Sequence, residues 1–535
     1  MITSISLHNY KAFENVSIPI KPLTIFLGAN SVGKSSIIQM LMLLHQTAEE
    51  QGQYSSALKI YGNYVNVGAF ENLFRDKDVS RPFSVRLELT SDEVDTLLRN
   101  CKNEFVRKFS NTIYSTDFSS DKKSIKRIKS REDFQDFLES YFSEIKQKKL
   151  NNDDHLLSFI RYRLDWDFDP KNDNNVAEVL RCYDFRDSIS KNANSNYSVL
   201  FQFIEDKKQL KIDKVSFSFG DNHKLIEIDS LSKNINIYSD FELTIQDREF
   251  ISSYLNFKNT IFDVVSDDFD SVAYYDLEEK STDSIDKHNA NRTLVSAFIL
   301  RICRVMMKNI QNELYGDNIN YVSPLRAHPK RYYMLDKAKM TISLDTLDGD
   351  AIAEVLKENK SLKEKVNNWF SKFGFKIEVE MFKEVIHQMH VSQNGLTLDI
   401  TDVGFGISQV LPIIIQGFLS SNESITVIEQ PEIHLHPRMQ ADLGDLFIDI
   451  VNTDKKQLII ETHSEYLLRR IRRRISEGKI SSNDVAICLF HPREGDTTAW
   501  VENLRINEKG SFEWPEDFYG GELYNDTLEY LKNQA

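Results

Sequence analysis

The stretch Gly28-Ala29-Asn30-Ser31-Val32-Gly33-Lys34-Ser35 has the pattern Gly-x-x-x-x-Gly-Lys-Ser, which predicts a phosphate-binding loop, or P-loop. The apolar run of residues 22–27 before it predicts a short strand, and residues 36–44 after it predict a buried helix. Strand, glycine loop and helix are the context that the pattern requires, because backbone N–H groups and the helix N-terminus then surround the phosphates. The stretch therefore predicts nucleotide binding.

The positions of the loop have separate expected roles. Lys34 is expected to reach the β- and γ-phosphates, and the Ser35 hydroxyl is expected to coordinate Mg²⁺. The glycines let the backbone close around the phosphates. The residues predicted to contact the nucleotide here are Asn30, Ser31, Gly33, Lys34, Ser35 and Ser36.

Composition narrows the class of protein. A chain of 535 residues is too long for one simple core, so we expect two or three domains. The net charge of −15 argues against a surface that binds nucleic acid throughout, although local basic patches remain open. The four cysteines form no Cys-x-x-Cys pair, which fits a reducing cytoplasm and neither a zinc site nor a disulfide framework. We expect no signal peptide and no bilayer-spanning segment.

The sequence divides into three parts at residues 1–90, 91–320 and 321–535. The middle part contains only two glycines, Gly220 and Gly316, and is rich in Asp, Asn, Ser and Lys. We interpret this part as an inserted, helix-rich α+β domain. Its basic cluster is either a solvated loop or a phosphate-binding patch. The cluster consists of Lys122, Lys123, Lys126, Arg127, Lys129 and Arg131.

A second glycine loop follows in residues 401–412. Gly404, Gly406 and Ser408 precede or open an apolar helix, so backbone amides, a hydroxyl and the helix dipole point toward one place. The pattern predicts either a second anion site or an ordinary helix N-terminus.

Two buried strands then end in polar residues. Residues 425–429 end at Glu429, a hard oxygen ligand of the kind Mg²⁺ prefers, as in a Walker B segment. Gln430 and Glu432 follow, and His434 with His436 is more simply a turn than a metal site. Residues 457–461 lead to His463. The arginines of the next helix, residues 469–474, form either a solvated face or a nucleic-acid contact.

These motifs together resemble the ATP-binding cassette ATPases of the SMC and RecF type, and within them the PtuA-type ATPases of Septu anti-phage systems and retrons. The residues that carry the resemblance are Asn9 to Phe13, the P-loop, Ser323 to Arg326, Gly404 to Pro412, Glu429 to Pro437, Glu461 to Ser464 and Trp514 to Phe518. The resemblance covers residues 1–90 and 320–535. It implies an α/β fold with two lobes of mixed sheet and helices, with the insert packed outside.

The resemblance also implies roles for individual residues. Lys11 approaches the nucleotide phosphates, unless it is an ordinary surface lysine. The loop from Gly404 and Gly406 to Ser408 and Gln409 binds the γ-phosphate held by a second subunit, and His463 hydrogen-bonds the γ-phosphate. Ser35 and Glu429 belong to the Mg²⁺ site. The glutamine that senses Mg²⁺ in this family is not identified in the sequence.

This sequence departs from the family after Glu429. The position that usually holds the carboxylate polarising the attacking water is Gln430, so slow hydrolysis is expected, unless Glu432 serves instead. The signature loop differs from the common Leu-Ser-Gly-Gly-Gln but resembles a Gly-x-Gly-x-Ser-Gln form.

The resemblance implies an ATPase that uses ATP and Mg²⁺ and assembles as a homodimer or larger homo-oligomer. It further implies a separate HNH nuclease partner (PtuB) and, in a retron, a reverse transcriptase with its RNA–DNA product. The residues after His463 are too few for the Toprim nuclease of the overcoming-lysogenisation-defect family, so no intrinsic nuclease is expected. Two alternatives remain: a RecF-like DNA-repair ATPase, and an ATP-binding scaffold with little turnover.

Overall fold

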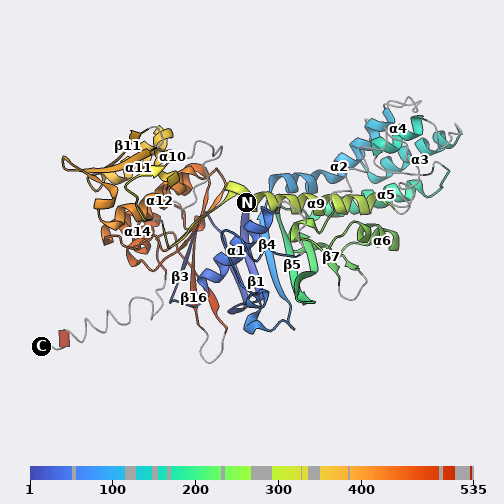
Figure 1. Cartoon of the computed structure of the whole chain (residues 1–535). Helices are drawn as coiled ribbons and strands as arrows, with labels where there is room; N and C mark the ends of the chain where they lie inside the picture. The colour runs from blue at the N-terminus through green and yellow to red at the C-terminus, as the bar shows by residue number, and fades with distance from the viewer. Residues whose placement is uncertain are drawn as a thin grey trace. The chain divides into compact units, whose positions relative to one another are not determined.

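The computed structural model shows a chain divided into two compact units (Figure 1). Unit 1 comprises residues 1–49, 60–78 and 312–535, and unit 2 comprises residues 50–59 and 79–311. The structure describes residues 1–50, 56–114, 128–147, 155–164, 169, 171–230, 235–266, 292–326, 328–334, 350–383, 386–492, 498–512 and 531–532. Mixed sheet and helix in unit 1 confirm the predicted α/β class.

A six-stranded sheet forms the centre of unit 1, in the order β17-β16-β3-β15-β14-β9. All neighbouring strands are parallel except β17, which is antiparallel to β16. The strands are β3 (Leu23–Gly28), β9 (Ile319–Val322), β14 (Ile425–Glu429), β15 (Gln457–Glu461), β16 (Val485–His491) and β17 (Trp500–Leu504). Because parallel strands end at one edge, the loops after β3, β14 and β15 meet there.

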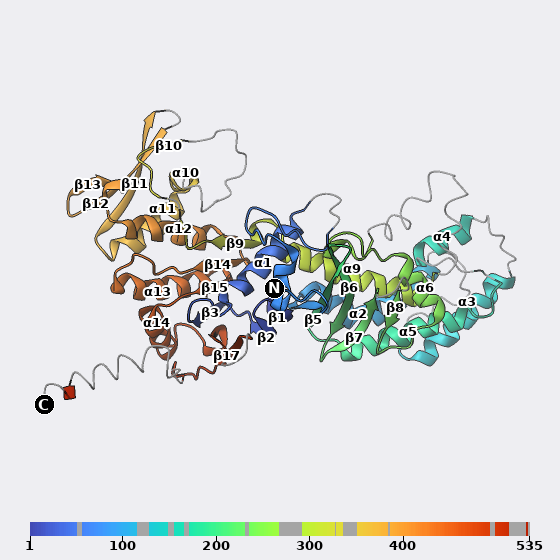
Figure 2. The same cartoon turned by 60° about the horizontal axis from the view of Figure 1, so that its bottom comes forward.

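Both faces of this sheet are covered at its centre, which explains why β3, β14, β15 and β16 are buried along nearly their whole length. Leu23, Ile25 and Leu27 of β3 belong to the core that includes residues of α12 (Phe405–Leu419), α13 (Pro437–Asp454) and α14 (Glu465–Ser476). Phe26 points to the opposite face, toward Ile37 and Leu41 of α1 (Lys34–Ala48). Figure 2 shows α13 and α14 next to each other beside β14 and β15.

The rest of unit 1 comprises two smaller groups. An antiparallel hairpin joins β1 (Ile2–Tyr10) to β2 (Phe13–Pro19). A smaller antiparallel sheet has the order β10-β12-β11, with β13 paired to β12. Its strands are β10 (Tyr333–Met334), β11 (Phe375–Lys383), β12 (Ile386–Gln393) and β13 (Leu396–Asp399), accompanied by helices α10 (Asp350–Glu358) and α11 (Lys360–Ser371).

Unit 2 combines an antiparallel arrangement of strands in the order β4-β5-β6-β7-β8 with helices. The strands are β4 (Phe83–Thr90), β5 (Asn196–Asp206), β6 (Gln209–Phe219), β7 (His223–Asp229) and β8 (Asn236–Tyr238). The helices are α2 (Asp92–Tyr114), α3 (Arg131–Gln147), α4 (His155–Leu164), α5 (Asn175–Asn192), α6 (Ile245–Ser253) and α9 (Leu294–Leu314), the last of which runs on into unit 1.

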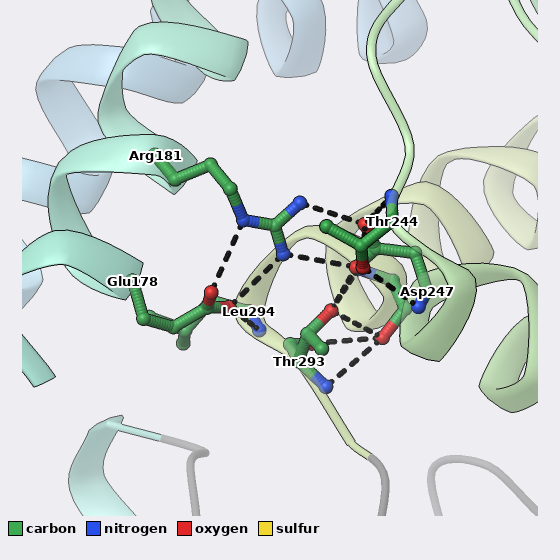
Figure 3. Close-up of polar contacts among 7 residues, drawn as sticks. Glu178, Arg181, Thr244, Asp247, Thr293 and Leu294 are labelled. Carbon is green, nitrogen blue, oxygen red and sulfur yellow. Dashed lines mark hydrogen bonds and ion pairs between the residues drawn. The ribbon is translucent and has the colours of Figure 1, made fainter. Parts of the chain in front are cut away.

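A buried carboxylate ties three helices of unit 2 together (Figure 3). Asp247, fully buried in α6, accepts hydrogen bonds from the Arg181 guanidinium of α5 at 2.7 and 3.0 Å and from the Thr293 hydroxyl before α9. It also closes a capping box with Thr244. Burial by itself raises the pKa of Asp247, but the hydrogen bonds from Arg181 and Thr293 hold that pKa below its usual value. Every bond shown satisfies a polar group, so the network has a structural role.

The structure sets several segment boundaries. Residues 201–219 lie in a hairpin of β5 and β6, whose turn places Lys207 and Lys208 at φ 53° and 62°. Residues 236–238 form the short β8, and α6 begins at Ile245. Residues 79–90, expected in the first ATPase part, belong to unit 2, and residues 312–320 belong to unit 1. Trp514 to Phe518 and residues 122–127 lie outside the described residues.

Candidate functional site

The P-loop connects β3 to α1 with an exposed crest and a buried base. Ala29, Asn30 and Ser31 are exposed, and Ser31 has a φ of 65°, which a non-glycine residue adopts at a cost. Gly33 precedes α1 with a φ of 104°, and a Cβ there would lie 2.6 Å from the Phe13 ring. No side chain caps the first turn of α1, and an uncapped helix N-terminus is a favourable place for an anion.

Lys34 lies beneath this loop with only 3% of its surface exposed. Its Nζ donates to the carbonyl oxygens of Gly28 and Ala29 at 3.0 and 2.7 Å. Burial lowers the pKa of Lys34, against the opposing effect of the charges of Glu461, Glu429 and Glu432. The lysine is therefore a buried cation placed at the base of the loop.

Glu461, which the sequence analysis did not select as a site residue, lies at the base of the P-loop. Its Oε2 accepts a hydrogen bond from Ser35 Oγ at 3.2 Å, and its Oε1 lies 3.8 Å from Lys34 Nζ. Burial raises the pKa of its carboxyl group. The sequence signal existed, because Glu461 ends a buried strand in an acid just as Glu429 does.

Glu429 is held by groups from β9 and the loop after it. Its Oε1 accepts from the Tyr321 hydroxyl at 2.6 Å, and burial raises the pKa of the Glu429 carboxyl group. Nη2 of Arg326 donates to the backbone carbonyl oxygens of Glu429 and Gln430 at 2.7 and 3.2 Å. Burial lowers the pKa of Arg326 to about 10. The sequence analysis included Arg326 only in the family resemblance, and it did not select Tyr321.

The turn after β14 places Gln430 and Glu432 differently. Gln430 has a φ of 46°, and its N–H donates to the Glu461 carbonyl at 2.7 Å. The two carboxylate oxygens of Glu432 accept from the Thr462 hydroxyl at 2.8 Å and from the His463 N–H at 2.6 Å. Glu432 thus holds the loop that carries His463 by two hydrogen bonds. Burial raises the pKa of the Glu432 carboxyl group.

His463 has an unsatisfied atom at this edge. Its Nε2 is buried and has no hydrogen-bond partner among the described residues. Burial, and then the charge of Lys34, lower the pKa of the imidazole, which favours the neutral ring. A neutral imidazole near Lys34 fits a role in hydrogen bonding to a phosphate, which stays a prediction.

The second glycine loop leads into α12. Gly404 is the N-cap residue of the helix, and a Cβ on Gly406 would lie 3.0 Å from the His434 carbonyl oxygen. Ser408 and Gln409 are 7% and 6% exposed. These side chains are therefore largely buried in the monomer, and their contact with a nucleotide held by a second subunit stays a prediction.

Lys11 lies against the P-loop helix instead of pointing freely into solvent. It has a φ of 47°, and its Nζ donates to the side chain of Gln39 in α1. Burial lowers the pKa of Lys11. Tyr10 beside it donates its hydroxyl to the Ser36 carbonyl at 3.3 Å. This position near the P-loop agrees with the expected role, which the structure does not test directly.

The structure bears on two alternatives from the sequence: the role of the His434 and His436 pair, and the role of the arginines in α14. His436 is the N-cap of α13, where its Nδ1 accepts from the Arg438 N–H at 3.3 Å, so this histidine belongs to a helix-initiating turn. Most α14 arginines pair with acids: Arg470 with Asp442 at 2.8 Å, and Arg474 with Asp445 at 2.6 Å. These ion pairs join α13 to α14 and weaken the case for a nucleic-acid contact.

The residues present fit a nucleotide with a divalent cation. The uncapped helix N-terminus, buried Lys34 and the unsatisfied Nε2 of His463 suit phosphate oxygens. The carboxylates of Glu429 and Glu461 and the hydroxyl of Ser35 are hard oxygen donors that suit Mg²⁺. Among the described residues no group of three or more His, Cys, Asp or Glu could hold a metal, and no helix is both long and apolar enough to cross a membrane.

Comparisons with known proteins identify the family of this chain. The AAA ATPase domain family matches residues 1–468. An OLD nuclease of Thermus scotoductus is 27% identical over 136 residues, so the match spans 25% of this chain and only 25% of that protein.

Two similar solved structures are head domains of SMC proteins. One is from Thermotoga maritima, with 7% identity, a TM-score of 0.33, and coverage of 94% of this chain and 99% of that chain. Another, derived from Pyrococcus furiosus and bound to the C-terminal domain of ScpA, has 10% identity, a TM-score of 0.35 and 99% coverage of both chains. The family match spans most of the sequence, including the P-loop, Glu429, Glu461 and His463. This chain therefore belongs to the AAA ATPase domain family.

Proposed function

We propose that this chain is the ATP-binding and ATP-hydrolysing subunit of a bacterial anti-phage defence complex, of Septu or retron type, that controls a partner HNH nuclease. The observation that carries the ATPase part is the meeting of Lys34, Ser35 and Glu461 at one sheet edge. The defence part is supported by the PtuA-type resemblance of the motifs. In this proposal the chain is a cytoplasmic protein.

In this proposal the site residues have separate roles in phosphoryl transfer. Lys34 and the α1 N-terminus bind the phosphates and neutralise their charge. Bound Mg²⁺ would supply further charge neutralisation, with Ser35 and Glu429 on its side of the site. His463 offers one neutral ring nitrogen to the γ-phosphate. Arg326 and Glu432 position the Gln430 and His463 loops.

We further propose that turnover is slow, so that bound ATP acts as a state signal. An amide such as Gln430 can hold a water but cannot take its proton at neutral pH. Both Glu432 oxygens already accept hydrogen bonds, which favours a positioning role over that of a general base. In this proposal ATP-bound subunits restrain the nuclease, and loss of ATP releases it.

The proposed assembly is a homodimer or larger homo-oligomer with composite ATP sites, bound to an HNH nuclease and, in a retron, to a reverse transcriptase with its RNA–DNA product. Co-purification of the chain with the products of neighbouring genes tests this directly. We expect an HNH nuclease to co-purify, and cleavage of DNA or RNA by the complex to change when Lys34→Ala removes nucleotide binding. Absence of any nuclease partner would overturn the defence proposal.

We propose no nuclease activity for this chain alone. Purified chain with Mg²⁺ or Mn²⁺ should leave DNA and RNA intact. Cleavage that survives repurification and disappears on mutation of this chain would contradict this. An ATP-gated scaffold with little turnover is the second candidate, favoured by Gln430. It predicts nucleotide binding without measurable phosphate release.

A further inference from the structure

Glu461 occupies a special position in the central sheet. It is the last residue of β15, the strand that lies between β3 and β14. In the parallel register of β14 and β15 it stands directly opposite Glu429. Neighbouring strands are about 4.8 Å apart, so the sheet brings two carboxylates to the same edge, next to the P-loop.

The distance from Glu461 to Ser35 matches that between neighbouring metal ligands. The Oε2 of Glu461 and the Oγ of Ser35 are 3.2 Å apart. Mg²⁺ holds oxygen ligands octahedrally at about 2.1 Å, so adjacent ligand oxygens lie about 3 Å from each other. An ion bound by Ser35 can therefore reach the Glu461 carboxylate with little movement of either side chain.

The charges around Glu461 also favour a cation at this place. The side chain is 4% exposed, so bulk water stabilises its negative charge only weakly. Its nearest described cation is Lys34, at 3.8 Å, whose ammonium also donates to two P-loop carbonyls. Phosphates that draw Lys34 toward them would weaken this ion pair. A divalent cation arriving with the phosphates would replace it.

We propose that Glu461 is a second carboxylate of the Mg²⁺ site, coordinating the cation together with Ser35 when nucleotide is bound. This inference rests on the proposed ATP binding. Glu429 supplies the neighbouring carboxylate, oriented by the hydroxyl of Tyr321. Nucleotide phosphates and water supply the remaining ligands, as is usual for Mg²⁺. In the nucleotide-free protein the same carboxylate holds Ser35 and Lys34 in place.

The test measures metal binding separately from turnover. Mn²⁺ is titrated into the full chain with saturating AMP-PNP and followed by electron paramagnetic resonance, while AMP-PNP affinity without metal is measured by calorimetry. Glu461→Gln keeps the size of the side chain and an acceptor for Ser35. We expect it to weaken Mn²⁺ affinity about 10-fold or more, with metal-free AMP-PNP affinity unchanged or tighter. Glu423→Gln, at an exposed loop position, is the matched control and should bind Mn²⁺ like the wild type.

The outcomes separate the two proposals. Wild-type protein that binds no AMP-PNP overturns the proposed function and this inference together. Wild type that binds AMP-PNP, with equal Mn²⁺ affinity in Glu461→Gln, overturns the inference alone. Should Glu461→Gln fail to fold, Glu461→Asp keeps the charge but shortens the side chain. It is expected to weaken Mn²⁺ binding too, and wild-type affinity in this variant would argue against coordination.

Discussion

The guanidinium of Arg326 donates through one nitrogen to the backbone carbonyl oxygens of Glu429 and Gln430, at 2.7 and 3.2 Å. An arginine that is 6% exposed thus holds the backbone of Glu429 and Gln430 in place. The contact links the loop after β9 to the end of β14. It shows that a buried side chain from another element holds the backbone at the sheet edge where the P-loop lies.

Replacing Arg326 should therefore affect stability and activity together. Arg326→Ala leaves two carbonyls without their donor, and we expect a loss of about 1.5–3 kcal/mol in the free energy of unfolding. Urea unfolding measures this, and phosphate release should fall in parallel. Arg331→Ala, which removes an exposed ion pair to Asp402, is the control and should change stability by less than about 1 kcal/mol. Equal effects of the two variants would show that Arg326 is not a positioning residue.

A shared ATP site predicts complementation between two inactive variants. Lys34→Ala and Ser408→Arg each remove one half of a composite site. Mixing them places both defects in one site and leaves the other intact, so partial ATPase activity should return. Because Ser408 is 7% exposed, thermal unfolding must first show that Ser408→Arg is folded. A mixture as inactive as either variant, with both proteins folded, would remove the support for the shared site.

The role of Gln430 is tested by restoring the acid. Gln430→Glu should raise the hydrolysis rate about 10-fold or more, since general-base catalysis is typically worth about 10²–10⁴ in rate. Single-turnover hydrolysis of ATP measures it. Glu432→Gln is the matched comparison. If wild type hydrolyses ATP rapidly and Glu432→Gln stops the chemical step with ATP affinity intact, Glu432 is the base and the slow-switch proposal is wrong.

His463 predicts a pH dependence of the nucleotide-free protein. Burial lowers the folded-state pKa of the imidazole below its unfolded value of about 6.5. The neutral ring therefore contributes stability that is present above pH 6.5 and is lost as the pH falls through the folded-state pKa. In urea unfolding from pH 7.5 to 5, His463→Gln should lose less stability than the wild type over this range. His8→Gln, at an exposed position, should follow the wild type.

The Asp247 network predicts a stability effect confined to unit 2. Asp247→Asn removes the charge facing Arg181 in a fully buried position, which should cost about 3–5 kcal/mol of unfolding free energy. The affinity for AMP-PNP should remain unchanged in protein that is still folded. Asp173→Asn removes a carboxylate that is 91% exposed and should leave the unfolding curve where it is. A large loss of nucleotide affinity in folded Asp247→Asn would contradict this separation.

Local sequence was sufficient to predict several central elements of this protein. The P-loop, the buried strands 425–429 and 457–461, and the helix after Lys34 could be predicted because each depends on neighbouring residues and on regular apolar spacing. Residues 201–219 form a hairpin of β5 and β6, and its turn lies within the polar run from Glu205 to Gln209.

The tertiary structure alone decided which polar groups meet. Ser35 and Glu461 are 426 residues apart in sequence, and Arg326 and Glu429 are 103 apart. No local spacing encodes these pairs. They arise because parallel strands β3, β15 and β14 end at one edge, and because burying a polar group without a hydrogen-bond partner is costly. The sequence by itself thus determined a nucleotide-binding loop and its acidic strand ends, and the register of the sheet decided that Glu461 belongs beside Ser35.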